Sequence, residues 1–431
     1  MDNWNEVVLE SICNNNKKAI ISGPFGSNIS SKFFTEEGIP VIRGNNLSLG
    51  DSEFIDDGFV FITEEKAKKL DCWAVENDLV FTSAGTLGQV GIIPHESNYP
   101  AYVISNKQLR ARVDDSIVLP KYAYYWFSTK WMISYFARND IGSTVPLLTL
   151  SELKRAPIRY PVNLGDQFKI VQLIDTINDK IATNKKLIEE LEETARLIHD
   201  YWFTQFDFPD ENGKPYCSSG GKMVWSEDLK REIPDDWEVG VISDLGEIVS
   251  GATPSTKNSD YYTDHGIAWI TPKDLSESGG KAFVSHGERD ITQAGYDSCS
   301  AKMMPPGSVV MSSRAPIGYL AIASEQCCTN QGCKSFVANK GYSPLYIYLT
   351  LSRFMPVIES WGAGTTFSEV SKDSLADVKV VLPPKRLVEE FEASAKSLFH
   401  QIYVSEKQID DLSAARNWLL PLLMNGQLVV E

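Results

Sequence analysis

Apolar residues recur at helical spacing over a long stretch in the middle of the chain. Residues 166–204 contain neither proline nor glycine. Steps of three and four residues separate most apolar side chains of this stretch, which are Ile170, Ile174, Ile177, Ile181, Ile188, Leu191, Ala195, Ile198 and Trp202. Asn184 interrupts the seam that they form. This heptad pattern predicts a long helix that takes part in a coiled coil.

A second stretch with the same pattern follows Pro383 and Pro384. Its seam contains Phe391, Ala395, Leu398, Ile402, Ser405, Ile409, Leu412, Arg416 and Leu419. A helix of about 38 residues is roughly 55 Å long. A helix of this length cannot bury its apolar stripe against its own small domain, so we expect the two helices to pair in antiparallel orientation.

The seam residues expected to form this helix pair are Ile181, Asn184, Ile188, Leu191, Ile402, Ser405, Ile409 and Leu412. Single polar residues in a coiled-coil seam often fix register and orientation. We give equal weight to the interpretation that Asn184 and Ser405 are weak points without such a role.

The chain also contains an internal repeat, which points to two domains of one fold. The glycines at 23 and 38 recur at 251 and 266, an offset of 228. Further matches follow in the same order: Val80–Gly88 with Val310–Gly318, Ser105–Gln108 with Thr329–Gly332, Gly142–Val145 with Gly364–Phe367, and Leu153 and Pro161 with Leu375 and Pro383. The small drift in offset is typical of loop insertions.

Each repeat has the pattern of an α+β domain. Short β-rich runs punctuated by Gly, Pro and Asn predict strands at Pro40–Arg43, Leu79–Thr82, Val90–Ile93 and Val378–Leu382. Aromatic and aliphatic residues at helical spacing predict helices at Lys121–Phe136 and Ser343–Ser360. The aromatic residues Tyr124, Trp126, Phe127 and Trp131 fit a domain core better than a base-stacking platform.

The predicted fold class is therefore α+β, with two pseudo-repeated domains separated by two long antiparallel coiled-coil helices. The expected boundaries are a first domain at 1–163, a first helix at 164–205, a linker at 206–236, a second domain at 237–383, a second helix at 384–424 and a tail at 425–431.

The composition is that of a globular protein without a membrane helix. The 431 residues are 43% hydrophobic and 23% charged, and no run of 18 apolar residues occurs. The polar, acidic start lacks the pattern of a secretory signal, so we expect a cytoplasmic protein. The seven cysteines are irregularly spaced, which favours reduced thiols. Cys327, Cys328 and Cys333 fit small buried side chains better than metal ligands.

The net charge of −16 is unevenly spread. Residues 1–164 hold 16 Lys and Arg against 19 Asp and Glu, whereas residues 206–382 hold 15 against 23. No segment is basic, so a surface that binds a polyanion has to come from folding.

Motifs for catalysis are missing from the sequence. None of the five histidines has the spacing of a metalloprotease motif, and no GxSxG segment occurs. The segment Ser219–Met223 departs from a phosphate-binding loop, because Tyr216 stands where the first Gly belongs and Met223 where Ser or Thr belongs. We therefore expect no catalytic residue and no metal site in this chain.

Several short sequence segments occur along with the order of domain, helix, domain and helix. These are Gly-Ile-Pro-Val-Ile-Arg-Gly-Asn-Asn-Leu at 38–47, Ser-Asn-Lys-Gln at 105–108, Gly-Ser-Thr at 142–144 and Leu-Leu-Pro-Leu-Leu-Met-Asn-Gly at 419–426. Each segment is loose, but their order is specific. Over essentially its whole length the chain resembles the specificity (S) subunit of a type I restriction–modification enzyme.

This resemblance implies two target-recognition domains, each of which reads one half of a split sequence in double-stranded DNA. The helices would bind two methyltransferase (M) subunits, which carry S-adenosylmethionine and methylate adenine. Motor–nuclease (R) subunits, which use ATP and Mg, would join for cleavage. The chain itself would hold no cofactor and catalyse no step.

Base readout needs Arg or Lys for guanine and Asn or Gln for adenine, and phosphates are bound by Lys, Arg, Ser and Thr. The repeat-matched loops of the first domain supply Arg43, Asn45, Asn46, Ser83, Thr86, Lys107 and Gln108, with Ser143 and Thr144 on the phosphate side. Those of the second supply Thr271, Lys273, Ser313, Arg314, Asn330, Gln331, Thr365 and Thr366. For each residue, a turn-capping role is the alternative. We expect the Lys and Arg of the acidic second domain to gather on one face.

Two other functions stay open. One is a coiled-coil scaffold whose two domains bind protein ligands without DNA, which the acidic balance favours. A salt-dependent affinity for duplex DNA separates this scaffold from a DNA reader. The other is a nuclease with a scattered carboxylate site, which metal-dependent turnover by the chain alone would reveal.

Overall fold

The computed structural model describes residues 3–14, 18–50, 52–138, 146–314, 316–362 and 369–430. The chain forms two compact units, the first from residues 1–181 and 411–431 and the second from residues 182–410. Each unit therefore contains one of the two repeated domains and a part of both long helices.

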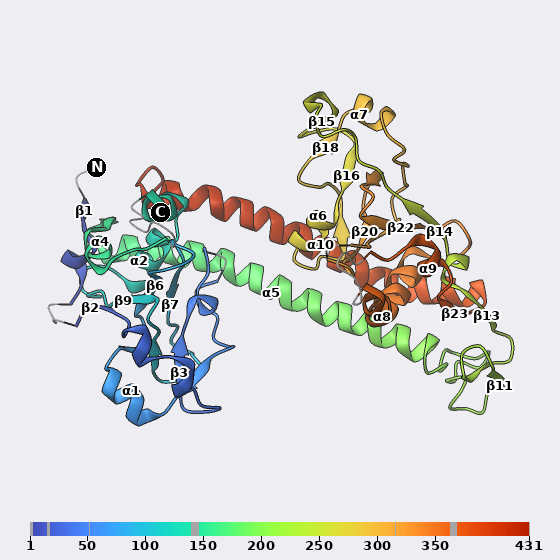
Figure 1. Ribbon diagram of the computed structural model, residues 1–431, viewed down its shortest axis with the longest axis horizontal. Coiled ribbons are helices and arrows are strands. Elements are labelled where there is room, and N and C mark those ends of the chain that lie inside the picture. The colour runs from blue at the N-terminus through green and yellow to red at the C-terminus, as the bar shows by residue number, and fades with distance from the viewer. Residues whose placement is uncertain are drawn as a thin grey trace. The chain divides into compact units, whose positions relative to one another are not determined.

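The first unit is built on two four-stranded sheets (Figure 1). One sheet is antiparallel and has the order β2 (Ile20–Ser22), β9 (Gln108–Ala111), β6 (Leu79–Thr82), β7 (Val90–Ile92). The other has the order β4 (Val60–Ile62), β3 (Ile39–Ile42), β8 (Tyr102–Ile104), β5 (Trp73–Ala74), with β3 and β8 parallel. A separate antiparallel pair joins β1 (Trp4–Val8) to β10 (Pro157–Pro161).

The helices of the first domain are α1 (Glu64–Leu70), α2 (Pro120–Phe127), α3 (Lys130–Arg138) and α4 (Leu150–Arg155). The prediction of a single helix over Lys121–Phe136 is wrong, because the helix is interrupted between α2 and α3. The hydroxyls of Ser128 and Thr129 donate to backbone carbonyls of α2, and Thr129 also accepts from the Met132 N–H, so both side chains favour a helix end there.

The aromatic residues of α2 form the core, as expected. Tyr124, Trp126 and Phe127 are buried, and the Phe127 ring packs edge-on against Phe81 of β6 at 5.3 Å between centroids. Trp131 differs from the expectation, since it is 55% exposed at the surface of α3.

The second unit repeats this topology. Its five-stranded sheet has the order β14 (Glu247–Ser250), β22 (Cys333–Val337), β19 (Val309–Ser312), β20 (Leu320–Ala323), β17 (Phe283–Val284). The first four strands follow the order and the antiparallel pairing of β2-β9-β6-β7. The parallel pair β16 (Ala268–Ile270) and β21 (Cys327–Thr329) corresponds to β3 and β8, and the antiparallel pair β13 (Glu238–Val241) and β23 (Lys379–Leu382) corresponds to β1 and β10. The sequence repeat is thus a repeat of strand order.

The second unit also has elements of its own. A short pair joins β15 (Tyr262–Thr263) to β18 (Asp290–Ile291), and the helices are α6 (Pro272–Glu277), α7 (Gln293–Asp297), α8 (Pro344–Gly362) and α9 (Lys372–Ala376). The segment 206–236 carries a hairpin of β11 (Met223–Ser226) and β12 (Arg231–Pro234). Phe206 and Phe208 of the same segment are buried against Trp237.

The two long helices are α5 (Leu164–Phe203) and α10 (Lys385–Met424), each of 40 residues. They run antiparallel within each unit. In the first unit Arg416 donates to the Asn178 side chain at 3.1 Å, and in the second Asn184 donates to the Gln408 side chain at 3.1 Å. Of the seam residues, Ile181, Leu191, Ile402 and Ser405 are buried, and Asn184, Ile188, Ile409 and Leu412 are half-buried. The expected fold class, α+β with two repeated domains and two long helices, is confirmed.

The helices also pack against the domains. This differs from the expectation that each helix buries its apolar stripe against the other helix. Ile170 and Ile174 of α5 belong to the hydrophobic core of the first unit. In the second unit Phe203 packs edge-on against Tyr346 of α8, at 4.8 Å between ring centroids. Each domain therefore covers part of the stripe that was assigned to the helix pair alone.

The apolar end of α10 docks on its own chain. Leu423 and Met424 are buried in the core of the first unit, and Leu419, Leu420 and Leu428 pack against that core. Among the residues that the structure describes, no helix is long and apolar enough to cross a bilayer.

Three cysteine side chains lie in the interior of the second unit. Burial raises the pKa of the thiols of Cys327, Cys328 and Cys333 to about 12. A thiol binds metal as the thiolate, so their environment favours the apolar, protonated form. Within the described ranges no three or more His, Cys, Asp or Glu side chains are grouped to hold a metal ion.

Candidate nucleic-acid interface

The repeat-matched loops of the first unit meet at one place, which we call the first junction: Gly23, Arg43–Asn46, Ser83–Thr86 and Ser105–Gln108. Backbone hydrogen bonds join these loops to one another. Ser105 donates to Ile42 at 2.9 Å, Ser83 to Lys107 at 2.8 Å and Gly23 to Gln108 at 2.9 Å. A Cβ atom on Gly23 would overlap the Ser105 carbonyl oxygen, so only glycine fits there.

Three of the predicted contact residues hold the first junction together from inside. Asn46 is fully buried, accepts from the Arg43 N–H and donates to the carbonyls of Ile55 and Asp57 at 3.0 and 2.8 Å. Gln108 is buried and accepts from the Ser105 hydroxyl. Ser83 is buried as well. Burial argues against base contacts by these three side chains in this conformation and favours the capping alternative.

The other predicted residues of the first junction face outward. Asn45, Thr86 and Lys107 are exposed, and Arg43 is half-buried with one guanidinium N–H donating to the Gly58 carbonyl at 3.1 Å. Among the described residues, Lys107 has no carboxylate partner. This edge of the unit therefore offers an amide, a hydroxyl and an ammonium group. Such groups form hydrogen bonds with base edges and with phosphate oxygens of DNA.

The second unit forms an equivalent second junction: Gly251, Ile270–Lys273, Ser313–Arg314 and Thr329–Gly332. Asn330 donates to Ile270 at 3.0 Å and Ser313 to Gly332 at 2.8 Å, as in the first junction. Gly251 again leaves no room for a Cβ atom beside the Thr329 carbonyl. The two junctions thus share one backbone arrangement.

Several predicted residues of the second junction serve its own structure. Thr271 caps α6 by accepting from the Asp274 N–H and donating to its carboxylate at 2.7 Å. Ser313 is fully buried and donates to the Gly332 carbonyl at 3.0 Å. The Asn330 side chain accepts from the Gly332 N–H at 2.8 Å, whereas Gln331 is exposed.

The cations near the second junction are neutralised by carboxylates. Lys273 lies 2.7 Å from Glu288, which raises the pKa of its ammonium group. Glu369 lies 3.2 Å from Lys334 and 3.9 Å from Arg314. These described cations are therefore paired with carboxylates, and the expectation that the Lys and Arg of this unit gather on one face stays a prediction.

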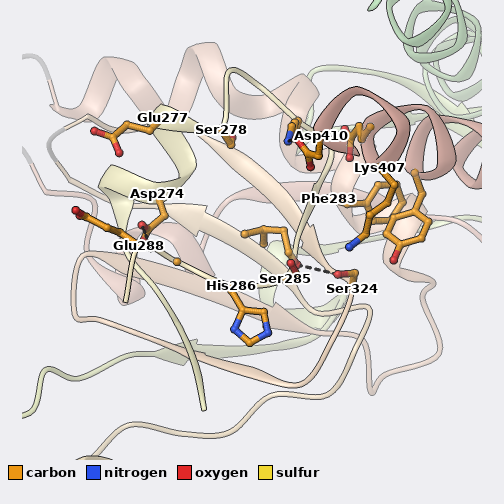
Figure 2. Close-up of a pocket in the computed structure, with 15 residues that line it drawn as sticks. Asp274, Glu277, Ser278, Phe283, Ser285, His286, Glu288, Ser324, Lys407 and Asp410 are labelled. Carbon is orange, nitrogen blue, oxygen red and sulfur yellow. Dashed lines mark hydrogen bonds and ion pairs between the residues drawn. The ribbon is translucent and has the colours of Figure 1, made fainter. Parts of the chain in front are cut away.

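An acidic cavity of about 320 Å³ lies beside this region, between α6, the segment around β17 and α10 (Figure 2). Glu288, Asp274 and Glu406 line it together with Lys281 and Lys407. Glu406 is 4% exposed, and burial raises the pKa of its carboxyl to about 7 although the Ala282 N–H donates to it at 2.6 Å.

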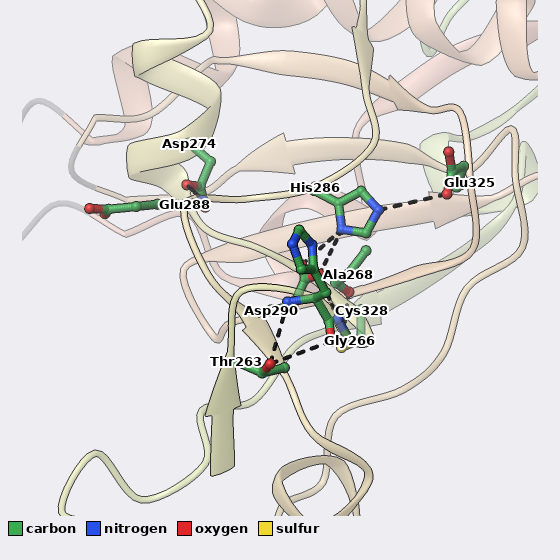
Figure 3. A network of polar contacts seen from close by, with 10 residues as sticks. Thr263, Gly266, Ala268, Asp274, His286, Glu288, Asp290, Glu325 and Cys328 are labelled. Carbon is green, nitrogen blue, oxygen red and sulfur yellow. Dashed lines mark hydrogen bonds and ion pairs between the residues drawn. The ribbon is translucent and has the colours of Figure 1, made fainter. Parts of the chain in front are cut away.

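A polar network borders the same cavity (Figure 3). His286 lines the cavity and lies 2.9 Å from the buried Asp290 and 3.7 Å from Glu325. Asp290 in turn accepts from the Gly266 N–H at 2.9 Å. Carboxylates thus gather on this side of the second unit, which accounts for part of its negative balance.

Some predicted residues lie outside the described part of the chain, namely Ser143, Thr144, Thr365 and Thr366. Sequence reasoning also missed two residues. Glu369 was not singled out, because nothing in the sequence links it to Lys334. Phe25 was missed although an aromatic residue between Pro24 and Gly26 in a turn-rich segment is a signal for an exposed loop.

Comparison with known proteins identifies the family. The family model for the type I restriction modification DNA specificity domain matches residues 1–193 and 234–390. The chain therefore belongs to this family.

Two relatives show the range of similarity. The type I restriction enzyme MjaIX specificity subunit of Methanocaldococcus jannaschii is 33% identical over 214 residues, which are 46% of this chain and 48% of that protein. The match thus spans about half the length of this relative. The type I restriction enzyme HindI specificity subunit of Haemophilus influenzae is 22% identical over 382 residues, which are 76% of this chain and 81% of that protein.

A solved structure supports the fold. The crystal structure of the type I restriction–modification system S subunit from M. genitalium superimposes with a TM-score of 0.58 at 14% identity, and the alignment covers 98% of this chain and 96% of that one. At this identity the comparison shows a shared fold.

Proposed function

We propose that this chain is the DNA-binding specificity subunit of a type I restriction–modification complex. It reads a target in two parts, one with each unit, and directs adenine methylation and DNA cleavage by partner subunits. The observation that carries the proposal is the doubled junction: the same loops meet in both units, and the backbone hydrogen bonds that Ser105 and Ser83 donate in the first unit recur from Asn330 and Ser313 in the second. A protein with two such sites suits a target with two separate halves.

The exposed and half-buried side chains of the junctions have the chemistry that readout needs. Asn45 and Gln331 carry amides suited to adenine, and Arg43 and Arg314 carry guanidinium groups suited to guanine. Lys107 and Thr86 suit phosphate oxygens. Buried Asn46, Gln108, Ser83 and Ser313 support the loops that carry these groups.

Partner subunits supply the chemistry in this proposal. The long helices α5 and α10 present a surface to two methyltransferase subunits, which hold S-adenosylmethionine. Motor–nuclease subunits with ATP and Mg complete the complex, which works on DNA in the cytoplasm. This chain contributes binding and orientation, and no catalytic group.

Methylation mapping tests the proposal. The chain is expressed with its neighbouring methyltransferase in a host without DNA methylation, and the genome is sequenced by a method that detects methyladenine. We expect one bipartite motif, fully methylated and absent when this chain is left out. If no methylation is detected and the two proteins do not co-purify, the proposal is contradicted.

The second candidate function is a scaffold that binds proteins. The pairing of Lys273, Arg314 and Lys334 with carboxylates favours it, because neutralised cations contribute little to phosphate binding. The affinity of the complex for duplex DNA distinguishes the two: a DNA reader loses affinity steeply as salt rises, whereas a scaffold shows no such affinity.

A further inference from the structure

Phe25 stands out on the surface of the first unit. It follows β2 in the loop that starts at Gly23, and its side chain is 85% exposed. A single exposed apolar residue is common in proteins. This one lies in a loop that starts at Gly23 of the first junction.

The backbone on both sides of Phe25 is held in place. The Gly23 N–H donates to Gln108 at 2.9 Å, and the Asn28 N–H donates to the Phe25 carbonyl at 2.8 Å. Gly26 lies against the side-chain amide of Asn106, since a Cβ atom there would be 3.1 Å from Nδ2. These contacts therefore hold the backbone of the loop that carries Phe25 beside Asn106, the residue before Lys107.

The repeat supports this placement. The offset of 228 that joins Gly23 to Gly251 brings Phe25 onto Thr253. The Thr253 hydroxyl donates to Gln331. Gln331 takes the place of Asn106, because the backbone hydrogen bonds of Ser105 and Lys107 on either side of Asn106 recur at Asn330 and Gly332. In both units this loop position thus adjoins the same readout segment, with an aromatic ring in the first unit and a hydroxyl in the second.

We propose that Phe25 contacts the apolar surface of a base in the half of the target that the first unit reads. This inference rests on the proposed function. Two parts of DNA offer such a surface: the 5-methyl group of thymine at the major-groove edge, and the face of a base that has partly lost its stacking. Either contact would make the first unit select at one position by apolar contact, where the second unit presents hydrogen-bonding groups.

The test uses the full chain in complex with its methyltransferase. Phe25→Ala is compared with the wild type and with Trp225→Ala, a control in which another aromatic residue, 57% exposed on β11 of the second unit, is removed. Duplex affinity and the methylated motif are measured, and thermal melting checks that each variant is folded.

We expect Phe25→Ala to weaken binding to the target about ten-fold and to relax the motif at one position of one half. Lys107→Ala identifies that half, because it belongs to the same junction. Trp225→Ala is expected to match the wild type. If Phe25→Ala keeps the wild-type affinity and motif, the inference is wrong while the proposed function stands. If the wild type itself yields no bipartite motif, the proposed function fails first.

Two substituted duplexes distinguish the sources of the contact. Replacing thymine by uracil in the first half removes the methyl group, and weaker binding by the wild type but not by Phe25→Ala assigns the contact to that methyl. A rise of 2-aminopurine fluorescence on binding by the wild type, absent with Phe25→Ala, assigns it to an unstacked base. If the wild type and Phe25→Ala respond alike to both substitutions, the inference is overturned.

Discussion

The first and second junctions have the same backbone and different surfaces. In both, a glycine without room for a Cβ atom and a set of N–H donors bring the loops together. The first then presents Lys107 and Phe25 to solvent, whereas the second ties its cations to Glu288 and Glu369. The comparison teaches that main-chain contacts keep the two junctions alike while the side chains at their surfaces differ.

The largest effect is expected where the two junctions agree. Gly23→Ala and Gly251→Ala each force a methyl group into a backbone carbonyl, and each should lower the free energy of unfolding by about 3 kcal/mol. Denaturant unfolding of the full chain measures this. Gly44→Ala is the control, because its nearest neighbour is the Gln89 side chain at 3.6 Å, and it should cost far less. Similar values for Gly44→Ala and Gly23→Ala would contradict the shared junction.

The stability of the acidic second unit should also depend on pH. Burial raises the pKa of Glu406 from 4.5 to about 7, so its contribution to stability is complete below pH 4.5 and is lost as pH rises through 7. Glu406→Gln removes this loss and should stabilise the protein at pH 8 by about 2 kcal/mol. Thermal melting at pH 5 and pH 8 checks the sign. A variant less stable than the wild type at pH 8 would show that the charged carboxylate is needed.

Lysine substitutions probe the difference between the junctions. Lys107→Ala removes a charge without a described carboxylate partner, so duplex affinity should fall about five-fold and the salt slope by about 0.9. Lys273→Ala removes a charge that Glu288 already neutralises and should leave the slope nearly unchanged. Titrations at 50 and 200 mM salt compare them. Equal slopes for both variants would remove the distinction between the two surfaces.

The smallest change should come from Glu369→Gln. It frees Lys334 and Arg314 from a carboxylate, so duplex affinity should rise about two-fold at low salt and approach the wild-type value at high salt. The same titrations measure it. A fall in affinity would mean that Glu369 positions its neighbours for binding.

The long-range organisation of the chain was readable from the sequence. Heptad spacing defined both long helices closely, and the repeat of Gly23 at Gly251 predicted two domains with one topology. These features repeat along the sequence, so they can be recognised without knowledge of tertiary contacts. The break at Ser128 and Thr129 was missed, because the aromatic spacing continues across two hydroxyl side chains that end one helix and start the next.

The candidate site was readable only in part. The sequence identified the loops, but it could not separate residues that face solvent from those that face inward. Asn46 is buried because carbonyls of Ile55 and Asp57 lie within its reach, and those partners follow from the fold rather than from its neighbours. The pairing of Glu369 with Lys334, 35 positions earlier in the chain, escaped for the same reason.

The central claim is that each junction contacts its own half of one DNA target. A photo-crosslinking amino acid placed at position 107 in one variant and at position 331 in another tests this in the complex bound to its duplex. We expect the first variant to crosslink to one half of the target and the second to the other half, with no crosslink to the bases between them. Crosslinks from both positions to the same half, or from neither position to DNA, would contradict the account.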